Sequence, residues 1–382
     1  MKRIAIIGSG ISGIGAAYAL KDTADITLFE AQDRLGGHAC THVFDYDGHE
    51  TAVDLGFIVY NGLNYPNLIG LFDALGVKTQ ESDMSFAVSD RDGWEWASTA
   101  RGIFAQKRNL FSIPFHRFWR TILKFNDLAR AELAAGRIED TTLGDWLDFH
   151  GFDQAFRCNY ILPMGAAIWS TPEVGMLDYP ARSFFQFFEN HRLMHKERPQ
   201  WRTVTGGSQS YVKAAAAELG DRVRTGTPAI RVFPFGDKIT VITRRAAWAS
   251  WNVIKQDNGD ICLSYWMNRL QGLDDSRPLF ITLNPETPPR EDLTFHQYAF
   301  DHPQFDTAAE AAVRGLKRIQ GQDGLWIAGA WMGRGFHEDG LKSGLSAALS
   351  LGGRVPWDAK GVDIHSPARK TPVMEIAAEV SV

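Results

Sequence analysis

The stretch RIAIIGSGISG, residues 3–13, decides the fold. Residues 3–7 form a short, continuous apolar run, which is typical of a parallel strand buried on both faces. Three glycines follow in the spacing G-x-G-x-x-G, and the small residues after them predict a helix as far as Leu20. A second apolar strand, residues 25–29, ends at Glu30. This order of strand, glycine turn, helix, strand and acid predicts a dinucleotide-binding unit of the α/β class.

Each part of the unit has a physical task. Gly8 makes the tight turn, Gly10 lets the backbone approach a pyrophosphate, and Gly13 lets the helix pack closely on the strand. The free N–H groups and the dipole of the helix N-terminus favour the negative charge of the pyrophosphate. The predicted pyrophosphate contacts are Gly8, Gly10, Ile11, Ser12 and Gly13. Glu30 can accept both hydroxyl hydrogens of the adenosine ribose.

The sequence after Glu30 distinguishes FAD from NAD. Residues 30–37, EAQDRLGG, resemble the E-x-x-x-R-x-G-G extension of FAD-dependent amine oxidases and carotenoid desaturases. In that family the arginine and the paired glycines lie along the FAD phosphates, which implies this role for Arg34, Gly36 and Gly37. An arginine supplies charge and donors, and two glycines allow close backbone approach. The resemblance also makes Ala31 and His38 neighbours of the cofactor.

Two later stretches extend the resemblance. Residues 53–57, VDLGF, resemble the family's D-L-G-G stretch beside the flavin ring, with Phe57 in place of the last glycine. Residues 325–329, LWIAG, predict a strand, residues 333–340 a loop and residues 341–350 a helix, as in the family's C-terminal FAD motif. That helix would point its N-terminus at the reduced flavin and stabilise its negative charge. The resemblance implies cofactor contacts by Gly56, Phe57, Ile58, Gly329, Ala330, Glu338, Gly340 and Leu341.

The middle of the chain predicts the rest of the architecture. A glycine-rich turn at 206–208, a helix from Tyr211 to Leu219 and a strand-rich segment as far as 232 resemble the family's return into the FAD domain, with Ile230 near the adenine. The family then continues with several tens of residues that are absent between about 243 and 245. Either the natural chain is trimmed there or the sequence omits a segment, and we favour the second reading.

We therefore predict a Rossmann-like FAD-binding domain of the amine oxidase type with an inserted α+β substrate domain. The FAD-binding domain comprises 1–83, 201–247 and 318–352, the substrate domain 84–200 and 248–317, and a tail 353–382. Strands at 248–253, 261–267 and 279–283 predict an antiparallel sheet above the flavin. The segment 84–200 is mainly helical and rich in aromatic residues, which are either core residues or the lining of an apolar tunnel.

The segment 97–126 contains no acidic residue but six Lys or Arg residues interleaved with aromatic ones. From about Pro114, Phe115, Phe118, Trp119, Ile122 and Phe125 share one helix face. This pattern predicts either a helix at an anionic membrane surface, through residues 101–125, or an amphipathic helix packed on its own domain. The net charge of −5 argues against a nucleic-acid partner.

The remaining composition sets the cellular context. Cys40, Cys158 and Cys262 are far apart, which favours reduced thiols and predicts neither disulfides nor a metal site. No apolar run reaches the ~18 residues of a membrane span, and the chain starts directly with a strand. We expect a cytoplasmic protein, peripheral at the inner membrane if the basic segment binds lipid.

These features lead to a functional hypothesis. A bacterial branch of the family that includes methyl fatty acid desaturases of furan fatty acid biosynthesis resembles this chain in GFIVYN (56–61), YWMNRLQ (265–271) and GFHEDGLKSG (335–344). The hypothesis is hydride removal from a lipid-like substrate, such as a phospholipid acyl chain, with desaturation as the reaction. His337 and Glu338 are the first candidates for the base, followed by Tyr265, Trp266 and Asn268. Amine oxidation of a small amine and a non-catalytic FAD-binding partner protein are the alternatives.

Overall fold

The chain was analysed as a computed structural model. It describes residues 1–89, 94–99, 102–104, 106–138, 141–169, 173–229, 251–255, 261–283, 291, 294–298 and 307–365. The predicted Ile230 contact, the junction at 243–245 and most of the predicted tail lie outside these residues.

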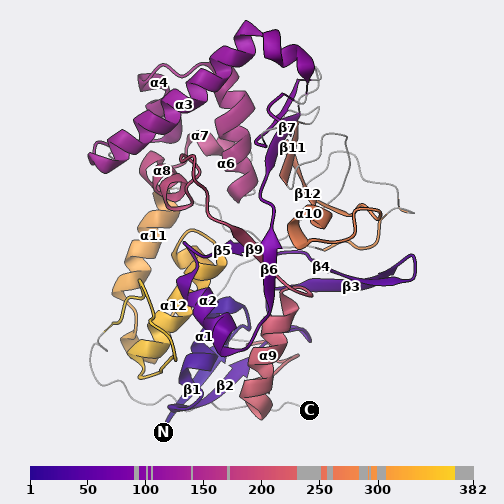
Figure 1. Cartoon of the computed structure of the whole chain (residues 1–382). Helices are drawn as coiled ribbons and strands as arrows, with labels where there is room; N and C mark the ends of the chain where they lie inside the picture. Colours follow the sequence, from indigo (N-terminus) through magenta and orange to yellow (C-terminus); the bar gives the residue numbers. More distant parts are fainter. Residues whose placement is uncertain are drawn as a thin grey trace.

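A nucleotide-binding domain lies at the bottom of Figure 1, around a parallel sheet in the order β1-β2-β10. Its strands are β1 (Lys2–Ile7), β2 (Ala24–Phe29) and β10 (Val223–Arg224). Its helices are α1 (Ile11–Leu20), α2 (Pro66–Ala74), α9 (Gln209–Leu219) and α12 (His337–Ser350). The predicted first strands and the first helix are confirmed. Their side chains form one buried core, in which apolar residues from both ends of the chain meet.

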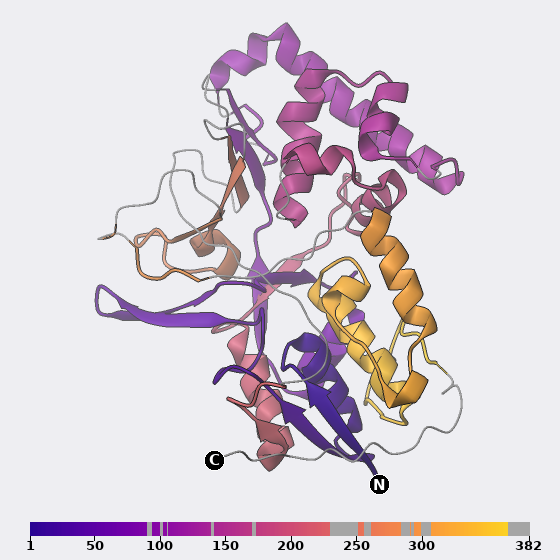
Figure 2. The same cartoon turned by 180° about the vertical axis from the view of Figure 1, so that it is seen from behind.

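Two small antiparallel units adjoin this domain. One is a long hairpin of β3 (Thr41–Tyr46) and β4 (His49–Asp54), which projects sideways in Figures 1 and 2. The other is a sheet in the order β5-β9-β6, from Val59–Asn61, Trp201–Val204 and Thr79–Ser82. It lies where the chain passes between the two domains (Figure 1).

The substrate domain combines a sheet with a group of helices. The sheet has the order β13-β12-β11-β7-β8, from Phe280–Leu283, Ile261–Trp266, Trp251–Lys255, Phe86–Ser89 and Glu95–Ala97. The three later strands confirm the predicted antiparallel sheet, although β11 pairs with β7 in parallel. The helices are α3 (Ile113–Ala134), α4 (Leu143–Phe149), α5 (Gln154–Phe156), α6 (Leu162–Trp169), α7 (Glu173–Leu177), α8 (Ala181–Asn190), α10 (Met267–Gln271) and α11 (Thr307–Arg318).

The aromatic face of α3 packs into the core of its own domain. Phe115, Phe118, Ile122 and Phe125 are all buried there, with Trp119 against them. Of the two readings of this helix, the packed amphipathic helix is therefore the one that the structure supports. The aromatic face cannot be the side that meets a membrane, because it is already covered by α8 and its neighbours.

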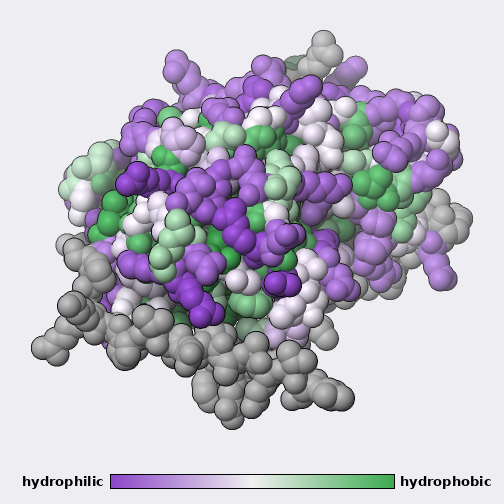
Figure 3. All heavy atoms as spheres, turned by 90° about the horizontal axis from the view of Figure 1, so that it is seen from below, coloured by the Kyte–Doolittle hydropathy of each residue, from purple (hydrophilic) through white to green (hydrophobic). Residues whose placement is uncertain are grey.

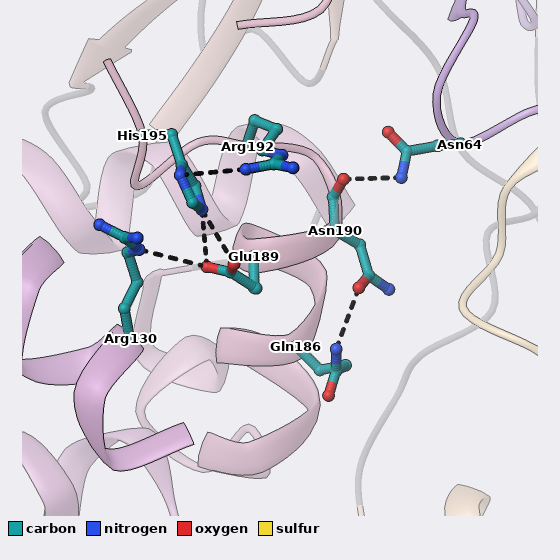
Figure 4. A network of polar contacts seen from close by, with 7 residues as sticks. All are labelled: Asn64, Arg130, Gln186, Glu189, Asn190, Arg192 and His195. Atoms are coloured by element: carbon teal, nitrogen blue, oxygen red, sulfur yellow. Dashed lines mark hydrogen bonds and ion pairs between the residues drawn. The ribbon is translucent and has the colours of Figure 1, made fainter. Parts of the chain in front are cut away.

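A polar network joins α3, α8 and the loop before α2 (Figure 4). The carboxylate of Glu189 accepts a hydrogen bond from His195 and faces the guanidinium of Arg130, 3.6 Å away. The side chain of Asn64 donates to the carbonyl of Asn190 at 2.7 Å. The end of α8 is thus fixed both to its own domain and to the nucleotide-binding domain.

One predicted element differs from the structure. Among the described residues, the segment 325–329 does not pair with another strand. Instead, the side-chain amide of Gln320 forms the two hydrogen bonds that a neighbouring strand would make. It donates to the carbonyl of Ile327 at 3.1 Å and accepts from its N–H at 3.0 Å. The first part of the predicted tail packs on the nucleotide-binding domain, where Trp357 lies against Gly70 and stacks on Tyr18.

Candidate functional site

The turn after β1 has the geometry of a pyrophosphate cradle. Gly8 lies in the left-handed region with φ +91°, and its N–H donates to the carbonyl of Phe29. A Cβ atom at Gly8 or Gly10 would meet nothing within 4 Å, so the space before the turn is open. A Cβ atom at Gly13 would lie 1.8 Å from the carbonyl oxygen of Gly8, so only glycine allows this close packing.

The N-terminus of α1 faces the same space. The helix starts from Gly10, receives no side-chain cap and carries no acidic residue in its first turn, so its first N–H groups remain available for an anion. Ile11 and Ser12 are the first residues of this turn, as the motif predicted. The cradle therefore fits a dinucleotide pyrophosphate.

Glu30 lies beside the turn, at the end of β2. Its Oε2 accepts hydrogen bonds from the N–H and the hydroxyl of Ser9 at 2.8 and 2.6 Å, and its Oε1 accepts from the N–H of Gln32 at 2.9 Å. Partial burial raises the pKa of Glu30, but these hydrogen bonds outweigh it and hold the pKa below its usual value. The carboxylate is ionised at neutral pH.

Arg34 contacts the backbone of the glycine loop that follows it. Its guanidinium donates to the carbonyl of Gly37 at 3.0 Å and to the hydroxyl of Tyr298 at 2.9 Å. It therefore shapes the glycine loop, in which Gly36 and Gly37 have φ values of +110° and +57°. The loop lies against the first turn, because a Cβ atom on Gly37 would be 3.1 Å from the Cα atom of Gly10. Nothing in the sequence signalled the contact with Tyr298. A direct phosphate contact by Arg34 stays a prediction, as does one by exposed Ala31.

The stretch 54–57 adjoins this loop through backbone contacts. The N–H of Phe57 donates to the carbonyl of His38 at 2.8 Å, and a Cβ atom on Gly56 would lie 2.3 Å from the same oxygen. Phe57 and Ile58 are buried, and the ring of Phe57 stacks on that of His337 with 3.8 Å between centroids. The structure thus brings together four predicted cofactor neighbours, Gly37, His38, Gly56 and Phe57.

Asp54 anchors the stretch. It is fully buried and accepts hydrogen bonds from Thr41, from the N–H and hydroxyl of Ser208, and from the amide of Gln271. Burial raises the pKa of Asp54 to about 6, although the hydrogen bonds from Thr41 and Ser208 oppose this effect. Because Gln271 belongs to α10, the carboxylate ties the nucleotide-binding domain to the substrate domain.

The C-terminal motif lies directly on the N-terminal one. A Cβ atom on Gly344 would be 2.0 Å from the carbonyl oxygen of Ser12, and one on Gly340 would be 2.7 Å from the side chain of Ile11. Leu341 is fully buried between the helices, against Gly15. Ser343 holds Gly329, next to Ala330, through hydrogen bonds to both its N–H and its carbonyl. The two ends of the chain therefore build one site.

The structure places Glu338 in the first turn of α12, where the sequence predicted a loop. Its carboxylate accepts from the N–H groups of Asn67 and Leu68 at 3.1 and 2.9 Å, and from the side-chain amide of Asn67 at 2.7 Å. It therefore caps the N-terminus of α2 and is 4% exposed. A carboxylate occupied in this way is poorly suited to serve as a base or as a ribityl ligand.

His337 is a weak base in this environment. Its Nε2 lies 3.0 Å from the hydroxyl of Tyr211, and its ring is stacked on Phe57. Burial, together with the charge of His38, lowers the pKa of His337 to about 3. The imidazole is neutral at physiological pH, and a base with so low a pKa has little driving force for proton abstraction.

The other predicted catalytic residues belong to the substrate domain. Asn268 is buried and bonded to the backbone of Asp274, Arg277 and Leu279, so it holds the loop before β13. Tyr265 is half-buried on β12 and packs edge-on against Trp251. Trp266 stacks with Phe280. Of these residues, Tyr265 is the one whose side chain carries a hydroxyl that can take part in proton transfer.

A row of stacked aromatic rings runs from the residue before α12 to the substrate domain. We call Phe336, Phe187, His191 and Trp201 the aromatic wall. Phe336 stacks on Phe187 at 4.8 Å between centroids, and Phe187 stacks on His191 at 3.9 Å. Trp201 stacks on the same histidine. Burial lowers the pKa of His191 to about 4, so this ring is also neutral. The cluster of phenylalanines at 184–188 indicated part of the wall, and His191 follows it by one helical turn. Phe336 carried no such signal because it is remote in sequence.

Comparison with known proteins identifies the family of the chain. The sequence profile of the flavin-containing amine oxidoreductases matches residues 11–247. A putative flavin-containing monoamine oxidase of Mycobacterium tuberculosis is 27% identical over 254 residues, covering 62% of this chain and 53% of that protein. A tryptophan 2-monooxygenase of Pantoea agglomerans is 28% identical over 211 residues, covering 49% and 35%. The chain thus spans about half the length, or less, of these curated relatives.

Solved structures share the fold. Cyclohexylamine oxidase from Brevibacterium oxydans superposes with a TM-score of 0.61 at 16% identity, covering 92% of this chain and 98% of that one. A fatty acid isomerase from P. acnes superposes with a TM-score of 0.58 at 13% identity, covering 90% and 97%. The open cradle, the uncapped α1 and the stacked glycine loops fit FAD, which is the cofactor. The chain belongs to the family of flavin-containing amine oxidoreductases.

Proposed function

We propose that this protein is an FAD-dependent oxidoreductase that removes a hydride from a hydrophobic, lipid-like substrate, with desaturation of a fatty acyl chain as its reaction. The observation that carries the proposal is the aromatic wall of Phe187, His191, Phe336 and Trp201, which leads away from the start of α12. Phe187 and His191 are buried, whereas Phe336 and Trp201 are half-buried. Side chains of this apolar character would suit contact with an alkyl chain.

The charge state of the wall supports the same substrate class. Both histidines are neutral at pH 7, because burial lowers the pKa of His191 to about 4 and that of His337 to about 3. Amine oxidases of the family often place a lysine near the flavin. Between residues 248 and 300 this chain has one lysine, Lys255, and the turn-like sequence QDNG follows it directly. The sequence therefore gives little support for such a lysine here. Arg334 is a charged group near the wall and donates to the carbonyl of Ser183 on α8, while the rings themselves carry no charge. Contact of an alkyl chain with uncharged rings desolvates few polar groups.

FAD supplies the acceptor for a hydride from a substrate C–H bond. The chain's own groups must hold the alkyl chain, exclude water and take up the second hydrogen as a proton. Glu338 is occupied at α2 and His337 is a weak base, so Tyr265 becomes our candidate for this proton. Its phenol would act as a relay, accepting the substrate proton while passing its own hydroxyl proton to solvent. A positioned acid or base of this kind contributes about 10²–10⁴-fold to the rate.

Amine oxidation is the second candidate. The curated relatives include a putative monoamine oxidase, and aromatic faces attract cations as well as alkyl groups. A small amine would therefore also find a partner in the wall.

Anaerobic mixing of the FAD-loaded protein with substrates separates these candidates. We expect the visible flavin absorption to bleach with a fatty acid or a phospholipid and to persist with putrescine, a monoamine or an aromatic amino acid. Bleaching by an amine alone would establish the second candidate instead. Persistence with every compound would indicate a non-catalytic FAD-binding protein.

A variant tests the proton acceptor. Tyr265→Phe should slow flavin reduction by the active lipid by about 10²-fold or more while leaving FAD binding intact. Tyr46→Phe, on the β3–β4 hairpin, is the matched control and should keep the wild-type rate. An unchanged rate in Tyr265→Phe would remove this residue from the mechanism.

A further inference from the structure

A basic and apolar surface caps the start of α3, at the top of Figure 1. Leu110, Phe111 and Ile113 are 46%, 89% and 74% exposed. They follow each other closely along the short turn of residues 107–111 and the first residue of α3. Large apolar side chains so exposed are normal singly, but a group of three is not. We call this group, together with the surrounding Lys107, Arg108, Arg117 and Arg120, the α3 cap.

Every charged residue in the described segment 106–120 is a lysine or an arginine. Lys107, Arg108, Arg117 and Arg120 are exposed around the apolar group. The nearest acidic residues along the chain are Glu95 and Asp127. In a protein of net charge −5 this is a local concentration of positive charge. A surface of this kind is complementary to an anionic partner.

The cap also contains a hollow. An open depression of about 510 Å³ is lined, among the described residues, by Ile113, His116, Arg117 and Arg120. His116 is oriented by the carbonyl of Leu110, 2.8 Å from its Nε2. Two guanidinium groups beside one apolar side chain suit a phosphate ester that carries a hydrocarbon part.

We propose that the α3 cap docks the protein onto a bilayer that contains anionic phospholipid. The exposed apolar side chains would enter the acyl boundary, and the arginines would bind headgroup phosphates. The docking side chains differ from the aromatic face of α3, which the core already covers. The lower face of the molecule offers a contrast, since its described hydrophobic residues are scattered among hydrophilic ones (Figure 3).

The proposal concerns binding and does not depend on the reaction. An amine oxidase with this cap would dock in the same way, so failure of the lipid-oxidation test leaves the docking test intact. The position of the cap, at the end of the substrate domain away from β1 and α1, would leave the nucleotide-binding domain in solution (Figures 1 and 2).

Vesicle sedimentation of the FAD-loaded protein tests the proposal. We expect binding to vesicles of phosphatidylglycerol and phosphatidylcholine, weaker binding at high salt, and little binding to pure phosphatidylcholine. Arg117→Glu with Arg120→Glu should weaken binding to the anionic vesicles at least about 30-fold, because each lysine or arginine near such a surface contributes about a fivefold factor. Phe111→Ser with Ile113→Ser should weaken it without changing its salt dependence.

Matched controls make a negative result meaningful. Lys213→Glu with Arg314→Glu changes the net charge equally on α9 and α11 and should bind like the wild type. Each variant must retain its flavin spectrum and melting temperature. Equal binding to neutral and anionic vesicles, or wild-type binding by the arginine variant, would overturn the proposal. Tight binding to a short DNA duplex without vesicle binding would also overturn it.

Discussion

At the residue scale, we expect glycine at position 10 to be needed for cofactor binding but not for folding. Its φ of −63° and ψ of 176° are accessible to alanine, and a Cβ atom there would meet nothing within 4 Å. Gly10→Ala should therefore leave the stability of the FAD-free protein within about 0.5 kcal/mol of wild type. The added methyl group would stand in the space of the pyrophosphate, so FAD affinity should fall at least about tenfold, or about 1.4 kcal/mol.

Titration with FAD and urea unfolding of the FAD-free protein measure the two effects separately. Gly13→Ala is the contrasting variant, because its Cβ atom would collide with the carbonyl of Gly8 and destabilise the fold itself. A Gly10→Ala protein that binds FAD as tightly as the wild type would show that the pyrophosphate lies elsewhere.

Glu338 was predicted to be a catalytic base, and its contacts indicate a structural role instead. As a buried cap of α2 it satisfies two backbone donors and one side-chain amide. Glu338→Ala should lower the free energy of unfolding by about 3 kcal/mol, since buried donors would lose a charged acceptor. The rate of flavin reduction in the folded, FAD-loaded fraction should change little. A stable variant with a greatly slowed rate would instead restore the role of Glu338 as a base.

At the scale of elements, α1 and α12 cross closely because glycine has no side chain. A Cβ atom on Gly344 would lie 2.0 Å from the carbonyl oxygen of Ser12, so no larger residue fits there without a shift of the helices. Gly344→Ala should therefore destabilise the protein by about 1–3 kcal/mol through overpacking, despite the better helix propensity of alanine. FAD binding should weaken as well, because both cofactor motifs meet at this crossing.

Gly315, inside α11, is the natural control for this variant. A Cβ atom there would meet nothing within 4 Å, so Gly315→Ala should stabilise the protein by about 0.5–1 kcal/mol through helix propensity alone. Thermal unfolding of both variants measures the difference. Equal effects of the two substitutions would mean that the helices are not in close contact.

At the scale of the whole molecule, Asp54 makes the joint between the domains sensitive to pH. Its folded pKa of about 6 exceeds its usual value of 3.8, because the site is buried. The folded protein therefore binds a proton between pH 4 and 6 that the unfolded chain has released. By linkage, the contribution of Asp54 to stability falls as pH rises through this window, by about 3 kcal/mol in total, and is constant above it.

Asp54→Asn should remove this slope, whatever its effect on absolute stability. Chemical unfolding of both proteins at pH 4.5 and pH 7 gives the comparison, in which the difference between the variants must change with pH. His191 and His337 also titrate in acid, with lowered pKa values, and their contributions cancel in that difference. A pH-independent difference would contradict the raised pKa of Asp54.

Local rules were enough to predict β1, the glycine turn, α1 and β2. Each of these elements depends on contacts between residues close in sequence, or on the absence of side chains at fixed spacing. The antiparallel strands β11, β12 and β13 were predicted for the same reason. The resemblance of the two terminal motifs to one family added their association, which the packing of Gly344 on Ser12 confirms.

Patterns within a few residues were thus enough to predict the fold class and the turn that would hold the pyrophosphate, because turn geometry and helix dipoles act over short distances, and the family resemblance added the cofactor. What the polar groups do became clear from the folded chain alone. Glu338 caps a helix 270 residues away, Gln320 replaces a strand neighbour, and Arg34 is held by Tyr298. Burial and partners set the task of a charged side chain, and both come from segments that are remote in sequence.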